Sequence, residues 1–289
     1  GVNVPWLAGK LAARQRRQAL EAVADGRAQV VVGTHALMQE GVAFRDLGLA
    51  IIDEQHRFGV HQRLALRDKG AVAGQVPHQL VMTATPIPRT LAMAAYADLD
   101  VSAIDELPPG RTPVQTVVLS AERRPELIER IRAACAQGRQ AYWVCTLIDD
   151  SDEVVAQAAQ GTFELLSEAL PELGVGLVHG RMKAAEKQDT MRRFKDGAID
   201  LLVATTVIEV GVDVPNASLM IVENAERLGL SQLHQLRGRV GRGSEASSCV
   251  LLYQPPLSQM ARQRLETMRE TGDGFVIAEK DLELRGPGE

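Results

Sequence analysis

Short runs of aliphatic residues recur along the chain, and stretches with helical signals separate them. Strands that alternate with helices in this way are typical of a parallel sheet covered by helices. The predicted strands lie at residues 29–33, 47–52, 79–82, 114–119, 141–145, 175–179, 201–204, 219–222 and 250–253. The predicted helices lie at residues 11–24, 88–96, 122–137, 152–170, 184–195 and 257–270. The pattern therefore predicts an α/β fold.

The alternation is interrupted at residues 107–113, which contain three prolines and a glycine. A segment of this composition forms a short, stiff and extended connection. With 289 residues, the chain is long enough for two domains of ordinary size. We therefore predict α/β domains at residues 1–108 and 109–256, followed by a helical extension at residues 257–289. A cleft between two such domains is a favoured place for a ligand.

The composition is that of a soluble globular protein, with 45% hydrophobic and 24% charged residues. The net charge of −5 excludes nucleic-acid binding by bulk electrostatics alone, although local loops and backbone amides can still follow a strand. The chain has neither an apolar run of membrane-span length nor a signal-peptide pattern, so we expect a cytoplasmic protein. Its three cysteines are far apart in sequence, and we expect them to be buried and unpaired.

Two adjacent carboxylates, Asp53 and Glu54, follow the predicted strand at residues 47–52. The aliphatic composition of this strand fits one that is buried on both faces of a parallel sheet. Ligands of such sheets bind just beyond the carboxyl ends of the strands. There, one carboxylate can hold a divalent cation while its neighbour orients a nucleophilic water, which is the chemistry of nucleotide hydrolysis. The alternative is that the pair begins a solvated loop, and the pair alone does not decide between the two.

Other loops that follow predicted strands also carry polar side chains. Arg239 and Arg242 lie in a stretch with two glycines, residues 235–242, and their planar guanidinium groups are suited to phosphate. An arginine that reaches a γ-phosphate from a second domain stabilises the charge of the transition state. Hydroxyl, imidazole or carboxylate side chains mark the remaining loops, at residues 33–35, 83–89, 178–182 and 204–215.

Taken in order, these stretches resemble motifs Ib to VI of the superfamily-two helicases and translocases, and the resemblance covers nearly the whole chain. Residues 33–39, 53–60 and 278–288 resemble more narrowly the RecG family of bacterial ATP-dependent DNA helicases, which remodel branched DNA in recombination and repair. The related Mfd family of transcription-repair coupling translocases usually has Asp-Glu-Glu-Gln where this chain has Asp-Glu-Gln-His. The resemblance implies two RecA-like motor domains, the first truncated, that use ATP and Mg²⁺. It also implies a monomeric motor with 3′-to-5′ polarity that binds forks and four-way junctions.

The resemblance implies roles for residues of the first domain. Asp53 would organise the Mg²⁺ ion, with Glu54 beside it, and Glu54 would polarise the attacking water. The connection between the nucleotide and motif III would involve Gln55, His56, Thr83 and Thr85.

Residues of the second domain also receive implied roles. Gln235, Arg239 and Arg242 match motif VI, with Arg242 as the first choice for the arginine finger and Arg239 as the second. The implied nucleotide sensors are Gly211 and Asp213. The candidates for contacts with the DNA backbone are Thr34, His179, Thr205 and Thr206. The candidates on the element that couples domain motion to DNA are Arg262, Arg264 and Arg285.

A phosphate-binding loop of the form Gly-x-x-x-x-Gly-Lys-Ser/Thr does not occur in this sequence. Gly9 and Lys10 are followed by Leu11, and Val4 occupies the position of the upstream glycine. We therefore expect a fragment that begins inside the first motor domain and ends inside the coupling loop, inactive alone but part of an ATPase. An Mfd-like translocase and a non-catalytic nucleic-acid-binding module are the alternative interpretations.

Overall fold

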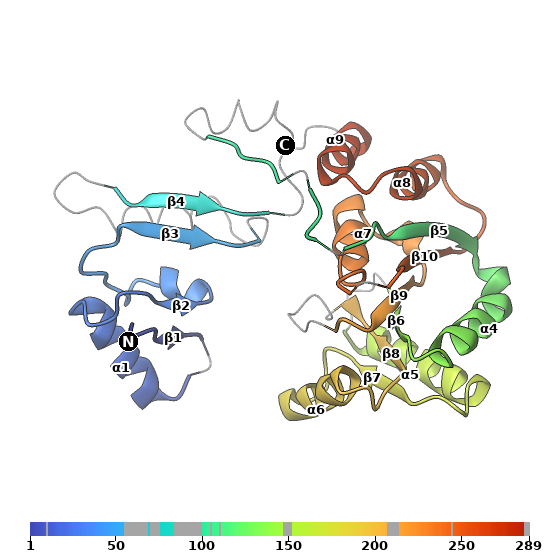
Figure 1. Ribbon diagram of the computed structural model, residues 1–289, viewed down its shortest axis with the longest axis horizontal. Helices are drawn as coiled ribbons and strands as arrows, with labels where there is room; N and C mark the ends of the chain where they lie inside the picture. Colours follow the sequence, from blue (N-terminus) through green and yellow to red (C-terminus); the bar gives the residue numbers. More distant parts are fainter. Residues whose placement is uncertain are drawn as a thin grey trace. The chain divides into compact units, whose positions relative to one another are not determined.

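The computed structural model divides the chain into two compact units, Gly1–Ala84 and Thr85–Glu289 (Figure 1). The structure describes residues 1–9, 11–54, 69, 76–83, 100–104, 106–109, 111–146, 152–206, 214–243 and 245–285. None of the described helices has the length and apolar composition that a membrane span requires.

The N-terminal unit contains two short parallel strand pairs. Strand β1 pairs with β2, and strand β3 pairs with β4. Helix α1 ends just before Gly26, whose φ of 78° is a conformation that glycine adopts without steric cost, and the sequence predicts a helix end here. The elements are β1 (Trp6–Leu7), α1 (Ala13–Ala24), β2 (Val32–Gly33), the 3₁₀ turn η1 (His35–Met38), β3 (Leu49–Ile52) and β4 (His78–Val81).

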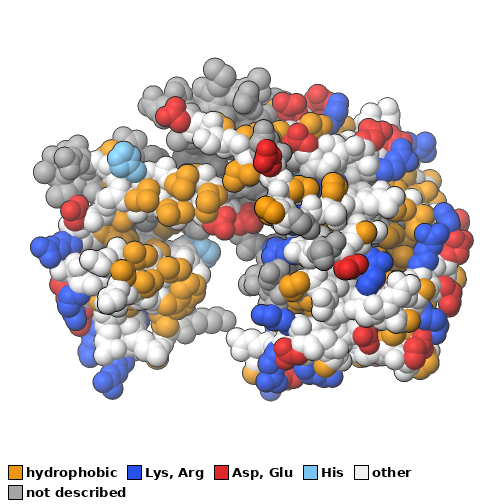
Figure 2. All heavy atoms as spheres, viewed as in Figure 1, with side chains coloured by type: hydrophobic (Ala, Val, Ile, Leu, Met, Phe, Trp, Pro, Cys, Tyr) orange, Lys and Arg blue, Asp and Glu red, His pale blue; other side chains and the backbone are white. Residues whose placement is uncertain are grey.

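Strand β3 is buried on one face only, so the expected burial on both faces is wrong. Ala50 and Ile52 are buried, whereas Leu49 and Ile51 are 54% and 59% exposed. The described residues cover only one side of the strand: Ala50 and Ile52 contact the side chains of Met38, Phe44 and Leu47. Hydrophobic side chains are correspondingly visible on the surface of this unit (Figure 2).

The C-terminal unit is built on a six-stranded sheet in which all strands are parallel. The strand order is β5-β10-β9-β6-β8-β7, so β10, the last of these six strands in sequence, lies between β5, the first of them, and β9. The strands are β5 (Gln115–Ser120), β6 (Gln140–Val144), β7 (Val175–Val178), β8 (Leu201–Ala204), β9 (Ala217–Val222) and β10 (Ser248–Tyr253). Each of them overlaps a strand that the aliphatic runs predict.

Helices follow the strands of this unit, and most of them agree with the predicted pattern. The helices are α4 (Arg124–Cys135), α5 (Asp152–Ala169), α6 (Ala184–Lys195), α7 (Leu230–Arg237), α8 (Gln259–Glu270) and α9 (Gly274–Arg285). Helix α6 has the predicted bounds, and Gly197 follows its end with a φ of 77°. Helix α7 was not predicted. The predicted helix at residues 88–96 lies outside the described residues.

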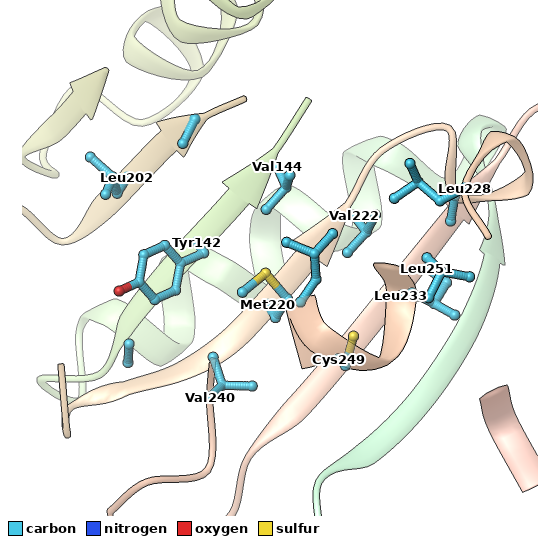
Figure 3. Close-up of a cluster of buried hydrophobic side chains, with 14 of the residues drawn as sticks. Tyr142, Val144, Leu202, Met220, Val222, Leu228, Leu233, Val240, Cys249 and Leu251 are labelled. Atoms are coloured by element: carbon cyan, nitrogen blue, oxygen red, sulfur yellow. The ribbon is translucent and has the colours of Figure 1, made fainter. Parts of the chain in front are cut away.

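Two hydrophobic cores cover the two faces of the sheet, because side chains alternate along each strand. Trp143 of β6 lies in the core that α4 and α5 cover. Its neighbours Tyr142 and Val144 lie in the core that α6, α7, α8 and α9 cover. Figure 3 shows part of this second core, with Met220 and Leu251 on neighbouring strands and Leu233 on the covering helix. The three cysteines are buried and unpaired, as expected.

Candidate nucleotide and nucleic-acid site

Asp53 and Glu54 lie directly beyond the carboxyl end of β3, where the sequence predicts a site. The Asp53 side chain is exposed, and its Oδ1 accepts a hydrogen bond of 2.9 Å from the backbone N–H of Glu54. Glu54 has a φ of 54°, a left-handed conformation that is uncommon for residues other than glycine. This turn leaves one carboxylate exposed to solvent at the strand end.

The strand register places part of motif III beside this acidic pair. Ile52 of β3 pairs with Val81 of β4, and the backbone N–H of Met82 donates to the carbonyl of Ile52 over 2.8 Å. Thr83 therefore follows β4 at the same edge of the strand pair at which Asp53 follows β3. The other members of this predicted group, Gln55, His56 and Thr85, lie outside the described residues.

The donor set at this edge can be compared with what Mg²⁺ requires. No group of three or more His, Cys, Asp or Glu side chains that could hold a metal ion occurs among the described residues. Mg²⁺ in nucleotide sites is held by one or two carboxylates together with phosphate oxygens and water. The exposed carboxylate of Asp53 fits that use, with the substrate supplying further oxygens.

Thr34 lies at the end of β2 in the same unit. Its Oγ1 accepts a hydrogen bond of 3.4 Å from the backbone N–H of Ala36 and so caps the 3₁₀ turn η1. The preceding Gly33 is required here, because a Cβ at this position would lie 2.2 Å from the carbonyl oxygen of Leu7. Thr34 is exposed and remains accessible to a ligand.

Arg239 and Arg242 lie on a short segment after α7, residues 238–242, which we call the arginine loop. The loop continues from the helix by backbone hydrogen bonds, from Gly238 N–H to the His234 carbonyl and from Arg239 N–H to the Leu236 carbonyl, both 3.0 Å. Val240 is fully buried beneath it, Arg239 is half-buried and Arg242 is exposed. Gln235, the third predicted residue of this motif, is half-buried on α7. The loop therefore presents the Arg242 guanidinium to solvent from a well-packed base.

The segment before β5 holds the arginine loop from its other side. The Arg111 Nε donates to the carbonyl of Gly241 over 2.8 Å. Gly241 has a φ of 76°, and a Cβ there would lie 2.7 Å from Cγ2 of Val114. The proline-containing segment at residues 107–113 thus contacts the predicted phosphate-binding loop directly. The sequence of the segment did not indicate this contact.

His179, Thr205 and Thr206 lie together at the carboxyl ends of two neighbouring strands. Val178 of β7 pairs with Ala204 of β8, and the Thr205 N–H donates to the Val178 carbonyl over 3.2 Å. Thr205 is buried, whereas His179 and Thr206 are half-buried. Burial lowers the pKa of His179, and the charges of Lys187 and Arg181 lower it further. A neutral imidazole beside these cations can donate one N–H to a phosphate.

The remaining predicted residues are placed only in part. Gly211 and Asp213 lie outside the described residues, as does the side chain of Arg285. On α8, Arg262 is exposed, whereas the Arg264 guanidinium donates to the carbonyls of Leu228 over 2.7 Å and Glu226 over 2.9 Å. Arg264 thus fixes α8 to the turn that precedes α7.

A buried carboxylate at the carboxyl edge of the second sheet was not predicted. Glu223 follows β9 and is 8% exposed. Its Oε2 accepts a hydrogen bond of 2.9 Å from the Trp143 indole, and its Oε1 pairs with Arg124 at the start of α4. The Arg124 guanidinium lies 5.4 Å from the centre of the Trp143 ring. These residues are far apart in sequence, so their spacing carries no signal, and the group joins α4 to the sheet.

Two family models match the chain. The DEAD/DEAH box helicase model matches residues 2–94, and the helicase conserved C-terminal domain model matches residues 123–244. The acidic pair falls within the first match, and the arginine loop falls within the second.

Individual relatives match the chain over its whole length. The ATP-dependent DNA helicase RecG of Haemophilus influenzae is 68% identical over 290 residues, and that of Bacillus subtilis is 47% identical over 289 residues. Each match covers all of this chain and 42% of the relative, so the chain spans about two fifths of their length.

Solved structures agree with these matches. A structure of RecG bound to a three-way DNA junction is 44% identical, with a TM-score of 0.73, and covers 100% of this chain and 37% of that one. A structure of the Mycobacterium smegmatis helicase Lhr bound to single-stranded DNA is 19% identical, with a TM-score of 0.64. The match covers 94% of this chain and 37% of that one, and it shows a similarity of fold alone.

Proposed function

We propose, from the premise that this chain belongs to the RecG family of helicases, that it forms the motor core of an ATP-dependent DNA helicase that remodels branched DNA. Its two units carry RecA-like helicase domains of superfamily two. The observation that carries the proposal is the similarity of the entire chain to RecG proteins, one of which is bound to a three-way DNA junction.

In this proposal the acidic pair of the first domain performs the hydrolytic step. Asp53 would hold Mg²⁺, and a bound Mg²⁺ would supply charge neutralisation to the phosphates of ATP. The Glu54 carboxylate accepts a hydrogen bond from the attacking water and orients it toward the γ-phosphorus. Gln55 and His56 relay the state of the nucleotide to Thr83 and Thr85. The support for this arrangement is the position of the pair at a strand end beside Thr83.

The arginine loop supplies the opposite charge from the second domain. The Arg242 guanidinium donates to the γ-phosphate oxygens as charge develops in the transition state, and Arg239 and Gln235 assist it. Gly211 and Asp213 sense the nucleotide from the same domain. The exposure of Arg242 on a loop with a buried base supports this assignment, because such a side chain is accessible and its backbone is restrained.

DNA is held in this proposal by contacts with its backbone. His179 and Thr206 bind phosphate oxygens from the second domain, Thr34 binds them from the first, and Thr205 contributes through its position in the same loop. Phosphate contacts set the position of the protein without reading sequence, which suits an enzyme that recognises a branch. The candidates that couple these contacts to domain motion are Arg262, Arg264 and Arg285.

The wider setting also belongs to the proposal. The protein acts in the cytoplasm as a monomer on replication forks and four-way junctions, in recombination and repair. Its domain limits are residues 1–108, 109–256 and 257–289.

The replacement Glu54→Gln in the intact protein tests the proposed function. We expect the rate of DNA-stimulated ATP hydrolysis to fall by about 10²- to 10⁴-fold, because the amide cannot accept the proton of the attacking water. Binding of a fluorescent ATP analogue should persist, since the replacement removes no group that binds phosphate. Steady-state hydrolysis and fluorescence anisotropy measure the two quantities.

A matched control is Glu21→Gln, which removes an exposed carboxylate from α1 of the same unit. It should leave hydrolysis unchanged. Turnover by Glu54→Gln equal to that of the wild type would remove Glu54 from the reaction, and a wild type that hydrolyses no ATP with branched DNA would refute the motor function.

A further inference from the structure

Arg237 ends α7 with a guanidinium group that lies inside the protein. Its side chain is buried, and the residue is 5% exposed. Nη1 donates to three oxygens, Oγ1 of Thr116 at 3.2 Å, the carbonyl of Met268 at 2.9 Å and the carbonyl of Thr271 at 2.7 Å. Nη2 lies 2.9 Å from Nδ1 of His234 on the same helix. One side chain thus joins α7, β5 and the end of α8.

The charge of this guanidinium is balanced by backbone dipoles. The partners of this guanidinium are one hydroxyl, two backbone carbonyls and one imidazole, and burial lowers its pKa. Met268 lies in the last turn of α8, and Thr271 is the C-cap residue that follows the helix. The last carbonyls of a helix have no partner within it and carry the negative end of its dipole. Arg237 therefore caps α8 from another helix.

The position of Arg237 in the chain connects this cap to the nucleotide site. The arginine loop begins at the next residue, Gly238, and Arg239 and Arg242 follow within the same loop. Catalytic groups must be held within a fraction of an ångström, so the base of such a loop has to be fixed. Helix α8 in turn packs against α9, and α7 contacts both. The backbone at the base of the loop is thus connected to the end of α8 through a single side chain.

We propose that Arg237 is a positioning residue for ATP hydrolysis, which fixes the arginine loop to the carboxyl end of α8 and transmits its displacement to the α8–α9 helix pair. This inference rests on the proposed function, because it requires the loop to bind a γ-phosphate. Arg237 itself touches neither nucleotide nor DNA in this account. It acts through the backbone of Gly238 on one side and through the carbonyls of Met268 and Thr271 on the other.

The test compares Arg237→Met and Arg237→Lys in the full-length protein. Methionine keeps much of the side-chain volume without donors, so kcat for DNA-stimulated hydrolysis should fall by about 10- to 100-fold, as expected for a catalytic group displaced by about 1 Å. The KM for ATP should change by less than about twofold, because the interaction acts in the transition state. Lysine retains a charge for the α8 carbonyls but lacks the fork, and should restore part of kcat.

Arg132 provides the matched control. Its guanidinium donates to the carbonyl of Ala169 at the end of α5 over 2.8 Å, so it caps a helix in the same unit without contact to the arginine loop. Arg132→Met should lower the thermal unfolding midpoint while leaving kcat unchanged. Equal losses of kcat in Arg132→Met and Arg237→Met would show a general effect of destabilisation and would overturn the inference.

Hydrogen exchange supplies a readout that a purely structural role would not alter. In the wild type, a non-hydrolysable ATP analogue should change amide exchange both in residues 238–243 and in residues 266–273. In Arg237→Met the first change should persist and the second should disappear. If that variant does not fold, Arg237→Lys replaces it, with a reduced second change. The inference is overturned if a folded Arg237 variant keeps both changes in amide exchange and hydrolyses ATP with the kcat of the wild type. A wild type that hydrolyses no ATP overturns the proposed function instead.

Discussion

Glu54 combines a catalytic side-chain type with an unusual backbone conformation. Its φ of 54° costs about 1–3 kcal/mol for a residue with a Cβ, and conformations of this kind persist where the surrounding structure imposes them. The Asp53 carboxylate accepts the N–H of Glu54 and so contributes to holding the turn. The first acid of the pair therefore orients the second through its backbone.

The exposed guanidinium of Arg242 leads to a kinetic prediction. Arg242→Ala in the intact protein should lower kcat for ATP hydrolysis by about 10³-fold or more, because an arginine finger acts on charge that develops in the transition state. The KM for ATP should change far less. Steady-state kinetics with branched DNA measures both, and Arg130→Ala, an exposed arginine on α4, is the control. An effect confined to KM would assign Arg242 to ground-state binding.

The positions of single residues were predictable where the signal is local in sequence. Asp53 and Glu54 stand at a strand end that the aliphatic run marks, and Arg242 lies between glycines in a short motif. Arg237 and Glu223 were not predictable, because their partners Thr116, Met268 and Trp143 come from distant parts of the chain. No pattern of spacing indicates which arginine in a motif turns inward.

At the scale of elements, two glycines with the same backbone conformation allow a matched comparison. Gly241→Ala and Gly197→Ala each place a Cβ at a φ near 77°, which costs about 1 kcal/mol or more. Only Gly241→Ala also brings the Cβ to 2.7 Å from Val114 Cγ2, whereas nothing lies within 4 Å at Gly197. We expect Gly241→Ala to lower the free energy of unfolding more than Gly197→Ala does. Only Gly241→Ala should also lower kcat for ATP hydrolysis.

Urea denaturation and ATP hydrolysis measure these two effects. Adding Val114→Ala to Gly241→Ala should recover part of both losses, because it removes the methyl group that the new Cβ meets. Equal stability and equal kcat for the two single variants would mean that the segment before β5 does not hold the arginine loop.

Elements were predictable in proportion to their length and regularity. Helix α6 begins and ends where the pattern places it, with Glu186 near its start and Gly197 after its end. Helix α7 has only 8 residues, and it lies beside a glycine-containing motif. Its buried leucines recur at every third residue, so neither the spacing of apolar residues nor the length of the segment indicates a helix. The strand β3 was predicted, but its exposed face was not, because an aliphatic strand does not specify what covers it.

For the whole molecule, the buried cysteines predict how stability varies with pH. Burial raises the pKa of Cys135 to about 11 and those of Cys145 and Cys249 to about 12. An unfolded thiol has a pKa of about 8.5, so above this pH the unfolded chain loses protons that the folded chain retains. The free energy of unfolding should therefore fall as pH rises above about 9, by at most about 1.4 kcal/mol per pH unit for each thiol.

Urea denaturation between pH 8 and pH 10 measures this slope. The variant Cys249→Ala removes the thiol that lies deepest in the core and should show a shallower slope than the wild type. If the free energy of unfolding falls equally with pH in both proteins, the Cys249 thiol has the same pKa in the folded and the unfolded chain. The comparison removes the contribution of lysines and tyrosines, which titrate in the same range in both proteins.

The strand order of the second unit has a consequence for biosynthesis. Among the described residues, β5 is an edge strand that pairs with β10, the strand of this sheet that is made last. A ribosome working at about 5–20 residues per second leaves β5 without its partner for on the order of ten seconds. During that interval the four strands from β6 to β9 can pair among themselves, because each of them has a neighbour within that group. The arginine loop precedes β10 in the chain, so the nascent protein completes this loop just before the strand that joins β5 to the rest of the sheet.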